Sequence, residues 1–191
     1  MTNPGFALFD TGIGCCAIAW SERGVAGVEL PGRSERATRE RLLRRFPGAG
    51  EAAPPAEIKR AIDDIVALLA GEARDLGYVK LDTGQLSDLQ RRVYEIARTI
   101  PAGLTLTYGD IAARLGDRML ARDVGQALGE NPFPIIVPCH RVLAANGKLG
   151  GFSAPGGAAT KLKLLAIEGA QPGGPTLFDR LPLAAPPRPR A

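Results

Sequence analysis

The chain has 191 residues, of which 45% are hydrophobic and 23% are charged, and it carries a formal net charge of +4. These values exclude global disorder and allow a hydrophobic core of one domain or two small ones. The mild excess of basic residues permits nucleic-acid binding without establishing it. Because the first residues lack a signal-peptide pattern and no apolar run could span a bilayer, we expect a cytoplasmic protein with no membrane partner.

The first half predicts a small antiparallel sheet with helices. Short apolar runs predict strands at residues 6–10, 15–20, 24–30 and 76–81, and helical spacing predicts helices at residues 34–46 and 57–70. The first helix is rich in arginine, but glutamates alternate with these arginines, which favours a solvated helix face over a phosphate-binding one. We find no catalytic motif in this half.

The second half predicts helices. Ser87 or Asp88 caps a helix that ends before Pro101, Thr107 caps a short helix over residues 108–115, and a third helix is expected at about residues 120–128. Two short helices joined by a tight turn suggest a helix-turn-helix unit. The third helix is built of small residues, which suits close approach to a DNA minor groove, although the same residues also suit packing between helices.

A cysteine and the only histidine of the chain stand next to each other at Cys139 and His140. The apolar residues 135–137, bounded by prolines, predict a short extended segment that ends at Cys139. On this pair alone, a buried structural cysteine and histidine are the favoured interpretation. Neighbouring side chains of an extended segment point to opposite faces, so contact between them needs a turn or a bridging water.

The three cysteines, Cys15, Cys16 and Cys139, are too few for a secreted disulfide scaffold and lack the spacing of a structural zinc site. After Cys139, Asn146-Gly147 predicts a hairpin or wing over residues 143–149, residues 150–157 form a glycine-rich loop, and residues 160–168 predict the last helix. Six prolines after Gln171 predict an extended tail.

Taken together, the spaced motifs of residues 89–170 resemble the O6-alkylguanine-DNA alkyltransferases, also called methylated-DNA–protein-cysteine methyltransferases. The matching segments are Ile-Pro-Ala-Gly at 100–103, Thr107-Tyr108-Gly109, Ala121-Arg122 with Val124-Gly125, Asn131-Pro132, Pro138-Cys139-His140-Arg141-Val142, Gly150-Gly151-Phe152-Ser153, and Lys161 to Gly169. The resemblance implies an α/β supporting domain (1–84), a mainly helical, winged helix-turn-helix-like domain that binds DNA and accepts the alkyl group (85–170), and a proline-rich tail (171–191).

By the same resemblance, the protein repairs DNA by direct reversal: it moves an alkyl group from O6-alkylguanine in double-stranded DNA irreversibly to Cys139, once per molecule. Glu168 orients His140, His140 draws the thiol proton, Tyr108 donates a proton or hydrogen bond to the leaving base, and Asn131 helps to orient that base. We expect a monomer that needs no metal and no cofactor.

The target atom lies inside the base stack, so the nucleotide has to be extruded. The resemblance makes Arg122 the finger that fills the vacated space. The other residues that it places at DNA or substrate are Ala121, Gly125, Ala127, Leu128, Gly129, Pro134, Arg141, Val142, Phe152 and Ser153. Asp123 and Glu130 depart from the pattern by placing acids near this surface, and the glycine-rich loop is two residues longer than usual.

Two other functions remain open from the sequence. A non-catalytic sensor of alkylated bases would have the same fold, but such relatives replace the cysteine that stands here at position 139. A Cys-His hydrolase is the less favoured alternative, because its two residues are usually distant in sequence and it needs an oxyanion hole that the sequence does not reveal.

Overall fold

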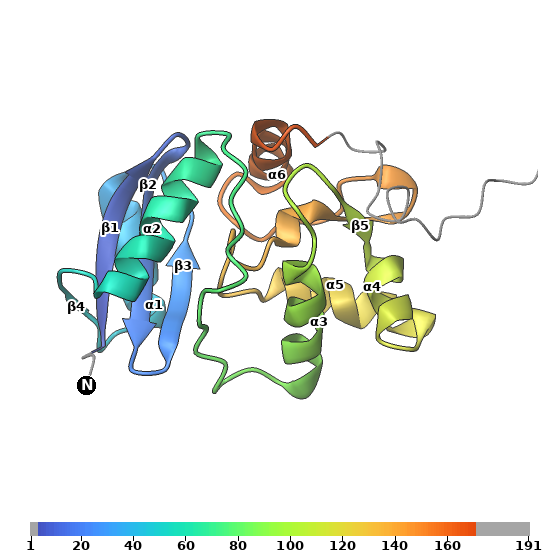
Figure 1. The fold of residues 1–191 in the computed structure, drawn as a ribbon, viewed down its shortest axis with the longest axis horizontal. Coiled ribbons are helices and arrows are strands. Elements are labelled where there is room, and N and C mark those ends of the chain that lie inside the picture. The colour runs from blue at the N-terminus through green and yellow to red at the C-terminus, as the bar shows by residue number, and fades with distance from the viewer. Residues whose placement is uncertain (1–3, 171–191) are drawn as a thin grey trace, which may run out of the picture.

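The computed structural model describes residues 4–170, which form an N-terminal sheet with two helices beside a second group of helices (Figure 1). Strands β1 (Gly5–Thr11), β2 (Gly14–Ser21) and β3 (Gly24–Glu29) are joined by tight turns and pair antiparallel, as predicted. The two-residue strand β4 (Gly50–Glu51) pairs in parallel with β1 and makes the sheet mixed, in the order β3-β2-β1-β4.

Two helices cover the opposite faces of this sheet, α2 (Ala56–Leu69) in front and α1 (Glu35–Arg45) behind it in Figure 1. The Ser34 hydroxyl accepts a hydrogen bond from the Ala37 amide and caps α1. Helix α2 buries Ile58, Ile62 and Ile65 along one side, as their spacing predicted. Both helices of the first half are therefore confirmed.

The strand predicted at residues 76–81 is wrong. The connection from α2 to the next helix runs in turns, and only Leu81 forms an isolated bridge, to Val25. The guanidinium of Arg98 donates hydrogen bonds to the carbonyl oxygens of Leu76, Gly77 and Val79, at 3.1, 2.8 and 2.7 Å. These carbonyls face one side chain instead of a neighbouring strand, which the local sequence could not indicate.

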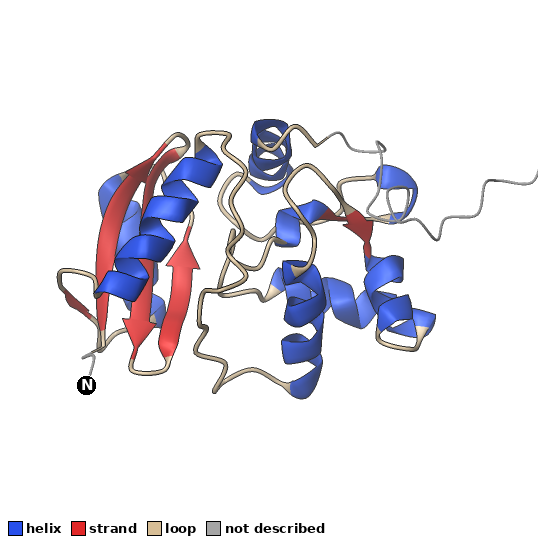
Figure 2. Cartoon of the chain, in the orientation of Figure 1, coloured by secondary structure: helices blue, strands red, loops and turns tan. Residues whose placement is uncertain are grey.

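The second half is mainly helical (Figure 2). Its helices are α3 (Asp88–Arg98), α4 (Tyr108–Arg114), α5 (Ala121–Gly129) and α6 (Gly157–Ile167), with short 3-10 turns at Arg118–Leu120, Cys139–Arg141 and Ala145–Gly147. Helices α3, α4 and α5 pack against one another. Capping boxes at Ser87 and Thr107 begin α3 and α4 where the sequence predicted their starts. Helix α6 begins three residues before its predicted start.

Two local predictions need correction. Residues 135–137 are not extended: Ile135 has a φ of 75°, and the Val137 amide donates to the Phe133 carbonyl at 2.8 Å, so the segment turns back on itself. The wing predicted at residues 143–149 has a tight turn at Asn146, but no ladder of paired strands. Instead β6 (Val142–Leu143) pairs in parallel with β5 (Leu106–Thr107).

The largest hydrophobic cluster contains residues of both halves, among them Ile18 and Ile65 from the first and Ile111 and Val137 from the second. The site that follows is therefore built on a continuous packed core. Within residues 4–170, no helix combines the length and the apolar character that crossing a membrane requires.

Candidate active site

Cys139 begins a 3-10 turn that continues through His140 and Arg141. Its amide donates to the carbonyl of Val137 at 2.8 Å, and the amide of Arg141 donates to the carbonyl of Pro138 at 2.9 Å. Cys139 is only 8% exposed, but it lines two cavities. The turn that adjacent Cys and His side chains require is therefore present.

Asn131 holds the segment before Cys139 in shape. Its side-chain oxygen accepts from the Phe133 amide and its side-chain nitrogen donates to the Val137 carbonyl, both at 2.9 Å. The Asn131 side chain also acts to lower the pKa of the Cys139 thiol, which favours the thiolate. The resemblance assigned Asn131 to orienting the base, whereas in the structure its side chain positions the segment that carries Cys139.

His140 is fully buried, and its Nε2 lies 2.9 Å from Oε1 of Glu168. Burial acts to raise the pKa of Glu168, but the hydrogen bonds and charges of His140 and Arg141 outweigh it and lower that pKa to about 2. Glu168 is therefore a carboxylate that accepts the Nε2 proton. The His140 Nδ1 is buried and has no hydrogen-bond partner among the described residues, so it is the nitrogen available as a base.

Arg141 is a structural partner of Glu168. Its Nε and Nη2 donate to the two carboxylate oxygens at 2.9 and 2.8 Å, and its Nη1 donates to the Ile100 carbonyl at 2.5 Å. The side chain is buried. The expectation that Arg141 contacts DNA or substrate is therefore wrong, because its guanidinium is turned inward.

Lys161 belongs to the site although the sequence gave it no role. It is fully buried, its Nζ donates to the carbonyl of Val142 at 2.6 Å, and this nitrogen lies 5.9 Å from the centre of the Tyr108 ring. Burial lowers its pKa to about 8, against the opposing effect of a charge on Cys139. The sequence did contain a signal for such a role, because Lys161 stands on an otherwise apolar helix face. A lysine is rarely buried without a partner.

Burial controls the resting charges at the site. It raises the pKa of the Cys139 thiol, while the Asn131 hydrogen bond and the Lys161 charge oppose the increase. Burial also lowers the pKa of His140, against the effect of Glu168. Thiol and neutral imidazole are therefore the favoured resting forms, and a thiolate formed there is stabilised by Asn131 and Lys161.

The first cavity beside the thiol, here called the Tyr108 cavity, has a volume of about 460 Å³, which is in the usual range for a small-molecule site. It is lined by Tyr108, Gly125, Leu128, Gly129, Cys139, Gly151, Phe152 and Ser153. Burial and the neighbouring Cys139 raise the pKa of Tyr108, so its hydroxyl stays protonated. This cavity brings together the Cys139 thiol and a hydroxyl donor.

The glycine-rich loop forms one wall of the Tyr108 cavity. The Ser153 hydroxyl donates to the carbonyl of Gly129 at 2.6 Å and ties the loop to the end of α5. Gly150 has a φ of 65°, and a Cβ there would lie 3.0 Å from the Tyr108 hydroxyl oxygen. The close approach of loop and tyrosine therefore requires glycine. Despite its extra length, this loop places Ser153 on the wall of the Tyr108 cavity.

The second cavity, here called the Arg45 cavity, has a volume of about 380 Å³ and extends from Cys139 toward the N-terminal sheet. It shares Cys139, Phe152 and Ser153 with the Tyr108 cavity. Its remaining lining residues are Val28, Glu29, Leu30, Arg41, Arg45, Asn131, Pro134, Ala154 and Pro155. The first half thus contributes side chains to a cavity beside the thiol, in addition to the supporting role expected from the sequence.

The residues predicted on α5 divide into two groups. Arg122 is exposed in the first turn of the helix and Ala121 is half-buried beside it. Ala127 and Leu128 are buried, and the Ala127 carbonyl accepts a hydrogen bond from Tyr94 at 2.8 Å. The Ala127 side chain therefore packs in the core and is not available to DNA, whereas Leu128 lines the Tyr108 cavity.

The acids near this surface also differ from each other. Glu130 accepts hydrogen bonds from the side-chain amides of Gln90 and Gln126, at 2.9 and 3.2 Å, so its carboxylate is held to the protein. Asp123 and Arg122 are both exposed, and within residues 4–170 no ion pair joins them. Asp123 therefore does not hold the arginine in place.

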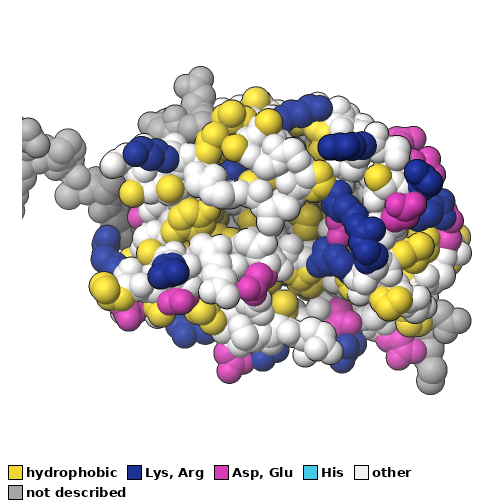
Figure 3. Space-filling model, turned by 180° about the vertical axis from the view of Figure 1, so that it is seen from behind, with side chains coloured by type: hydrophobic (Ala, Val, Ile, Leu, Met, Phe, Trp, Pro, Cys, Tyr) yellow, Lys and Arg dark blue, Asp and Glu magenta, His cyan; other side chains and the backbone are white. Residues whose placement is uncertain are grey.

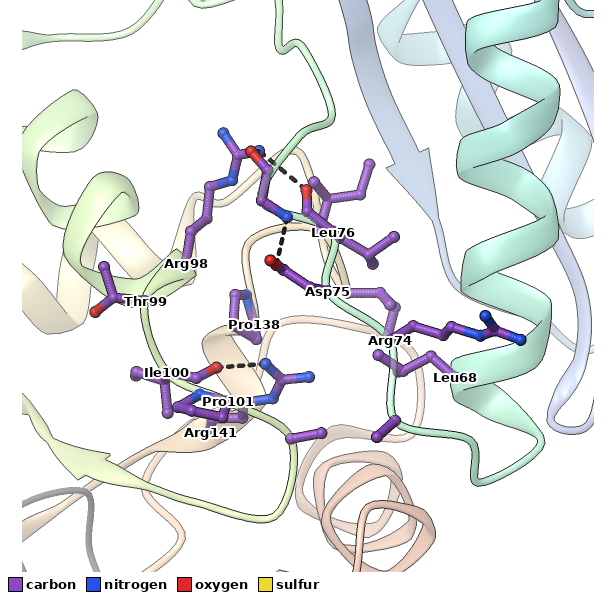
Figure 4. Close-up of a pocket in the computed structure, with 15 residues that line it drawn as sticks. Leu68, Arg74, Asp75, Leu76, Arg98, Thr99, Ile100, Pro101, Pro138 and Arg141 are labelled. Atoms are coloured by element: carbon purple, nitrogen blue, oxygen red, sulfur yellow. Dashed lines mark hydrogen bonds between the residues drawn. The ribbon is translucent and has the colours of Figure 1, made fainter. Parts of the chain in front are cut away.

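A larger cavity of about 500 Å³ lies at the junction of the two halves, and Cys139 does not line it. Figure 4 shows Arg98, Asp75 and Leu76 on one side, and Pro101 and Arg141 on the other. The Arg141 side chain is directed to the carbonyl of Ile100 there. This cavity lacks the nucleophile, so we place the chemistry in the other two.

Comparisons with known proteins show what the chain is similar to. Residues 88–170 match the family model described as "6-O-methylguanine DNA methyltransferase, DNA binding domain". The chain is 44% identical over 126 residues to the methylated-DNA–protein-cysteine methyltransferase of Mycolicibacterium paratuberculosis, over 65% of this chain and 74% of the relative. It is 33% identical over 166 residues to the protein of the same name from Methanosarcina acetivorans, over 86% and 98%.

Solved structures show the same fold. The OGT of Mycobacterium tuberculosis in complex with DNA superimposes with a TM-score of 0.69 at 34% identity, over 86% of this chain and 92% of that one. The O6-methylguanine-DNA methyltransferase of Pyrococcus kodakaraensis gives a TM-score of 0.66 at 26% identity, over 88% and 100%. The similarity therefore includes the sheet of the first half as well as the helices.

Proposed function

The chain belongs to the family of methylated-DNA–protein-cysteine methyltransferases, and we propose that its Cys139 thiol accepts the alkyl group. The activity is repair of DNA by transfer of an alkyl group to the protein. The substrate that we propose is O6-alkylguanine in double-stranded DNA, bound with its base in the Tyr108 cavity. The observation that carries the assignment is a buried thiol on the wall of that cavity, next to a histidine whose free nitrogen is Nδ1.

The chemistry follows from the charges at the site. With Nε2 bound to Glu168, the Nδ1 of His140 takes the thiol proton through solvent, and the thiolate that remains attacks the alkyl carbon. The new bond joins Sγ to that carbon, and the bond from the carbon to O6 of guanine breaks. Overall, the alkyl group replaces the thiol proton and guanine gains one proton.

Three other groups assist this displacement. Tyr108 donates a hydrogen bond to the base as negative charge develops on it, because its raised pKa keeps the hydroxyl protonated. Asn131 and Lys161 stabilise the thiolate before it attacks. The product is a thioether with no good leaving group, so each molecule reacts once.

Arg122 supports the step that delivers the base. It is exposed at the start of α5, whose residues Gly125, Leu128 and Gly129 line the Tyr108 cavity. A long cationic side chain at this place fills the space left in the duplex when the nucleotide turns out. Ala121 and Gly125 allow close approach of α5 to the minor groove.

We further propose that the protein acts as a monomer in the cytoplasm, with residues 85–170 as the DNA-binding and acceptor unit and residues 1–84 as its support. The free thiols at Cys15, Cys16 and Cys139 fit a reducing compartment. The tail at residues 171–191 lies outside the described residues.

The test is transfer of a labelled methyl group from a duplex that contains O6-methylguanine. Cys139→Ala should abolish labelling while DNA binding persists, and the matched control Cys15→Ala should be labelled like the wild type. Undiminished labelling of Cys139→Ala would refute the assignment. Repeated turnover on an amide or ester would indicate a hydrolase, and lesion binding without transfer by the wild type would indicate a sensor.

A further inference from the structure

The Arg45 cavity lies where a substituent on O6 of the base would need space. It begins at Cys139, Phe152 and Ser153, which it shares with the Tyr108 cavity, and it extends away from α5 toward β3 and α1. When the sulfur attacks the first carbon in line with O6, the rest of a longer substituent projects to the side of that carbon. A base in the Tyr108 cavity therefore places such a substituent at the mouth of the Arg45 cavity.

The far wall of the Arg45 cavity is charged. Glu29 is only 5% exposed, and its carboxylate accepts hydrogen bonds from Arg41 and from Arg45, the latter at 2.7 Å. Arg41 also donates to the carbonyl of Leu30 at 3.3 Å. Two guanidinium groups face one carboxylate, so the lining of this cavity carries one surplus positive charge.

These two arginines differ from the others of α1. Arg36 pairs with Glu40 and Arg39 with Glu51, in partly exposed pairs at the surface. Arg41 and Arg45 instead share the buried Glu29 and both line a cavity. Figure 3 shows the molecule from behind, and basic side chains gather there on the half formed by the N-terminal sheet and its helices. A shared buried acceptor fixes both guanidinium groups before any ligand arrives, which lowers the entropic cost of binding an anion.

We propose that the Arg45 cavity receives the O6 substituent, and that Arg41 and Arg45 select substituents that end in an acidic group, such as carboxyalkyl chains. The proposal rests on the proposed function, since it concerns the same transfer to Cys139. Sγ bonds to the first carbon of the substituent, the bond from that carbon to O6 breaks, and the carboxylate at the other end remains unchanged. Each guanidinium has N–H groups beyond those directed at Glu29, and these donate to the incoming carboxylate.

The experiment compares three duplexes that differ only in the lesion: O6-methylguanine, O6-(3-carboxypropyl)guanine, and the amide of the same shape, O6-(3-carbamoylpropyl)guanine. Single-turnover transfer rates give the ratio of acid to amide for each protein. Because the two longer substituents match in size, any general loss of DNA binding or folding cancels in this ratio. Methyl transfer by the same preparation tests the proposed function separately.

Variants should move the ratio in opposite directions. Arg45→Gln removes one cation, and the acid-to-amide ratio should fall by about fivefold, because the pair is partly exposed to solvent. Glu29→Gln removes the competing carboxylate and should raise the ratio by a similar factor. Arg44→Gln is the control, because Arg44 is exposed on the same helix and does not line the cavity.

The outcomes separate the two proposals. The wild-type protein could transfer methyl groups while neither Arg45→Gln nor Glu29→Gln changes the acid-to-amide ratio. This result would overturn the selection of acids and leave the proposed function standing. Equal losses on all three duplexes would also overturn it and would indicate that Arg45 contacts a DNA phosphate. Absence of methyl transfer by the wild-type protein would instead refute the proposed function.

Discussion

Glu168 accepts the Nε2 proton of His140 across 2.9 Å, although 28 residues separate them in sequence. The same carboxylate binds both ends of the Arg141 guanidinium fork. One buried acid therefore fixes the tautomer of the histidine and anchors the turn that carries Cys139. The geometry of the nucleophile depends on this contact between α6 and the turn.

Glu168→Gln should destabilise the fold by about 3 kcal/mol, because it leaves the buried Arg141 cation without its anion. Urea unfolding monitored by circular dichroism measures the change. Glu95→Gln on the exposed side of α3 serves as the control, with an effect of less than about 0.5 kcal/mol. Equal stability of the two variants would show that the carboxylate does not anchor the turn.

The contribution of Glu168 should also depend on pH. Its pKa is lowered from 4.5 to about 2 in the folded protein, so its stabilisation is complete above pH 4.5 and is lost as the pH falls toward 2. The difference in unfolding free energy between the wild type and Glu168→Gln should therefore shrink between pH 6 and pH 3. A difference that stays constant over this interval would contradict the lowered pKa.

Lys161→Met should raise the pKa of the Cys139 thiol, because it removes the nearby cation that favours the thiolate. Carbamidomethylation of Cys139, followed by peptide mapping against pH, should be about tenfold slower than in the wild type at pH 7. The difference should diminish above pH 8, since Lys161 itself loses its proton at about that pH.

Lys163→Met provides the matched control, because Lys163 is exposed on the same helix. In this variant the Cys139 thiol should react at the wild-type rate over the whole pH range. A Lys161→Met protein with an unchanged pH profile would leave the buried lysine with a packing role only.

Arg122→Ala should slow transfer from duplex DNA by about a hundredfold more than transfer from free O6-benzylguanine, because the loss of the finger affects only the extrusion of a base from the stack. Rates at saturating DNA isolate this step. Arg118→Ala, which alters another exposed arginine in the turn before α5, should weaken DNA binding at most and leave the saturated rate unchanged. Equal losses on duplex and free base would exclude the finger role.

The sequence was most informative where local chemistry decides the structure. The Ser87 and Thr107 caps predicted the starts of α3 and α4, and short apolar runs separated by turns predicted the three antiparallel strands. The prediction failed at residues 76–81, where three carbonyl groups are bound by the side chain of Arg98 at the end of α3. It also failed at Ile135, whose positive φ depends on the surrounding hydrogen bonds of Asn131.

The site showed the same division. Cys139, His140 and Glu168 stand in motifs that carry the family resemblance, and the structure brings the side chains of His140 and Glu168 together. Lys161 and the cluster of Arg41, Glu29 and Arg45 were not, since their roles depend on packing between segments far apart in the chain. The inward turn of Arg141 could not be inferred from a basic residue beside the nucleophile.

The most direct test of the central claim is the number and position of alkyl groups on the protein after reaction with excess duplex that contains O6-methylguanine. Intact-protein mass spectrometry with peptide mapping measures both. We predict that one methyl group replaces one hydrogen in each chain, that it lies on Cys139, and that repaired guanine never exceeds the amount of protein. Repair beyond one equivalent, or a methyl group on another residue, would contradict the account.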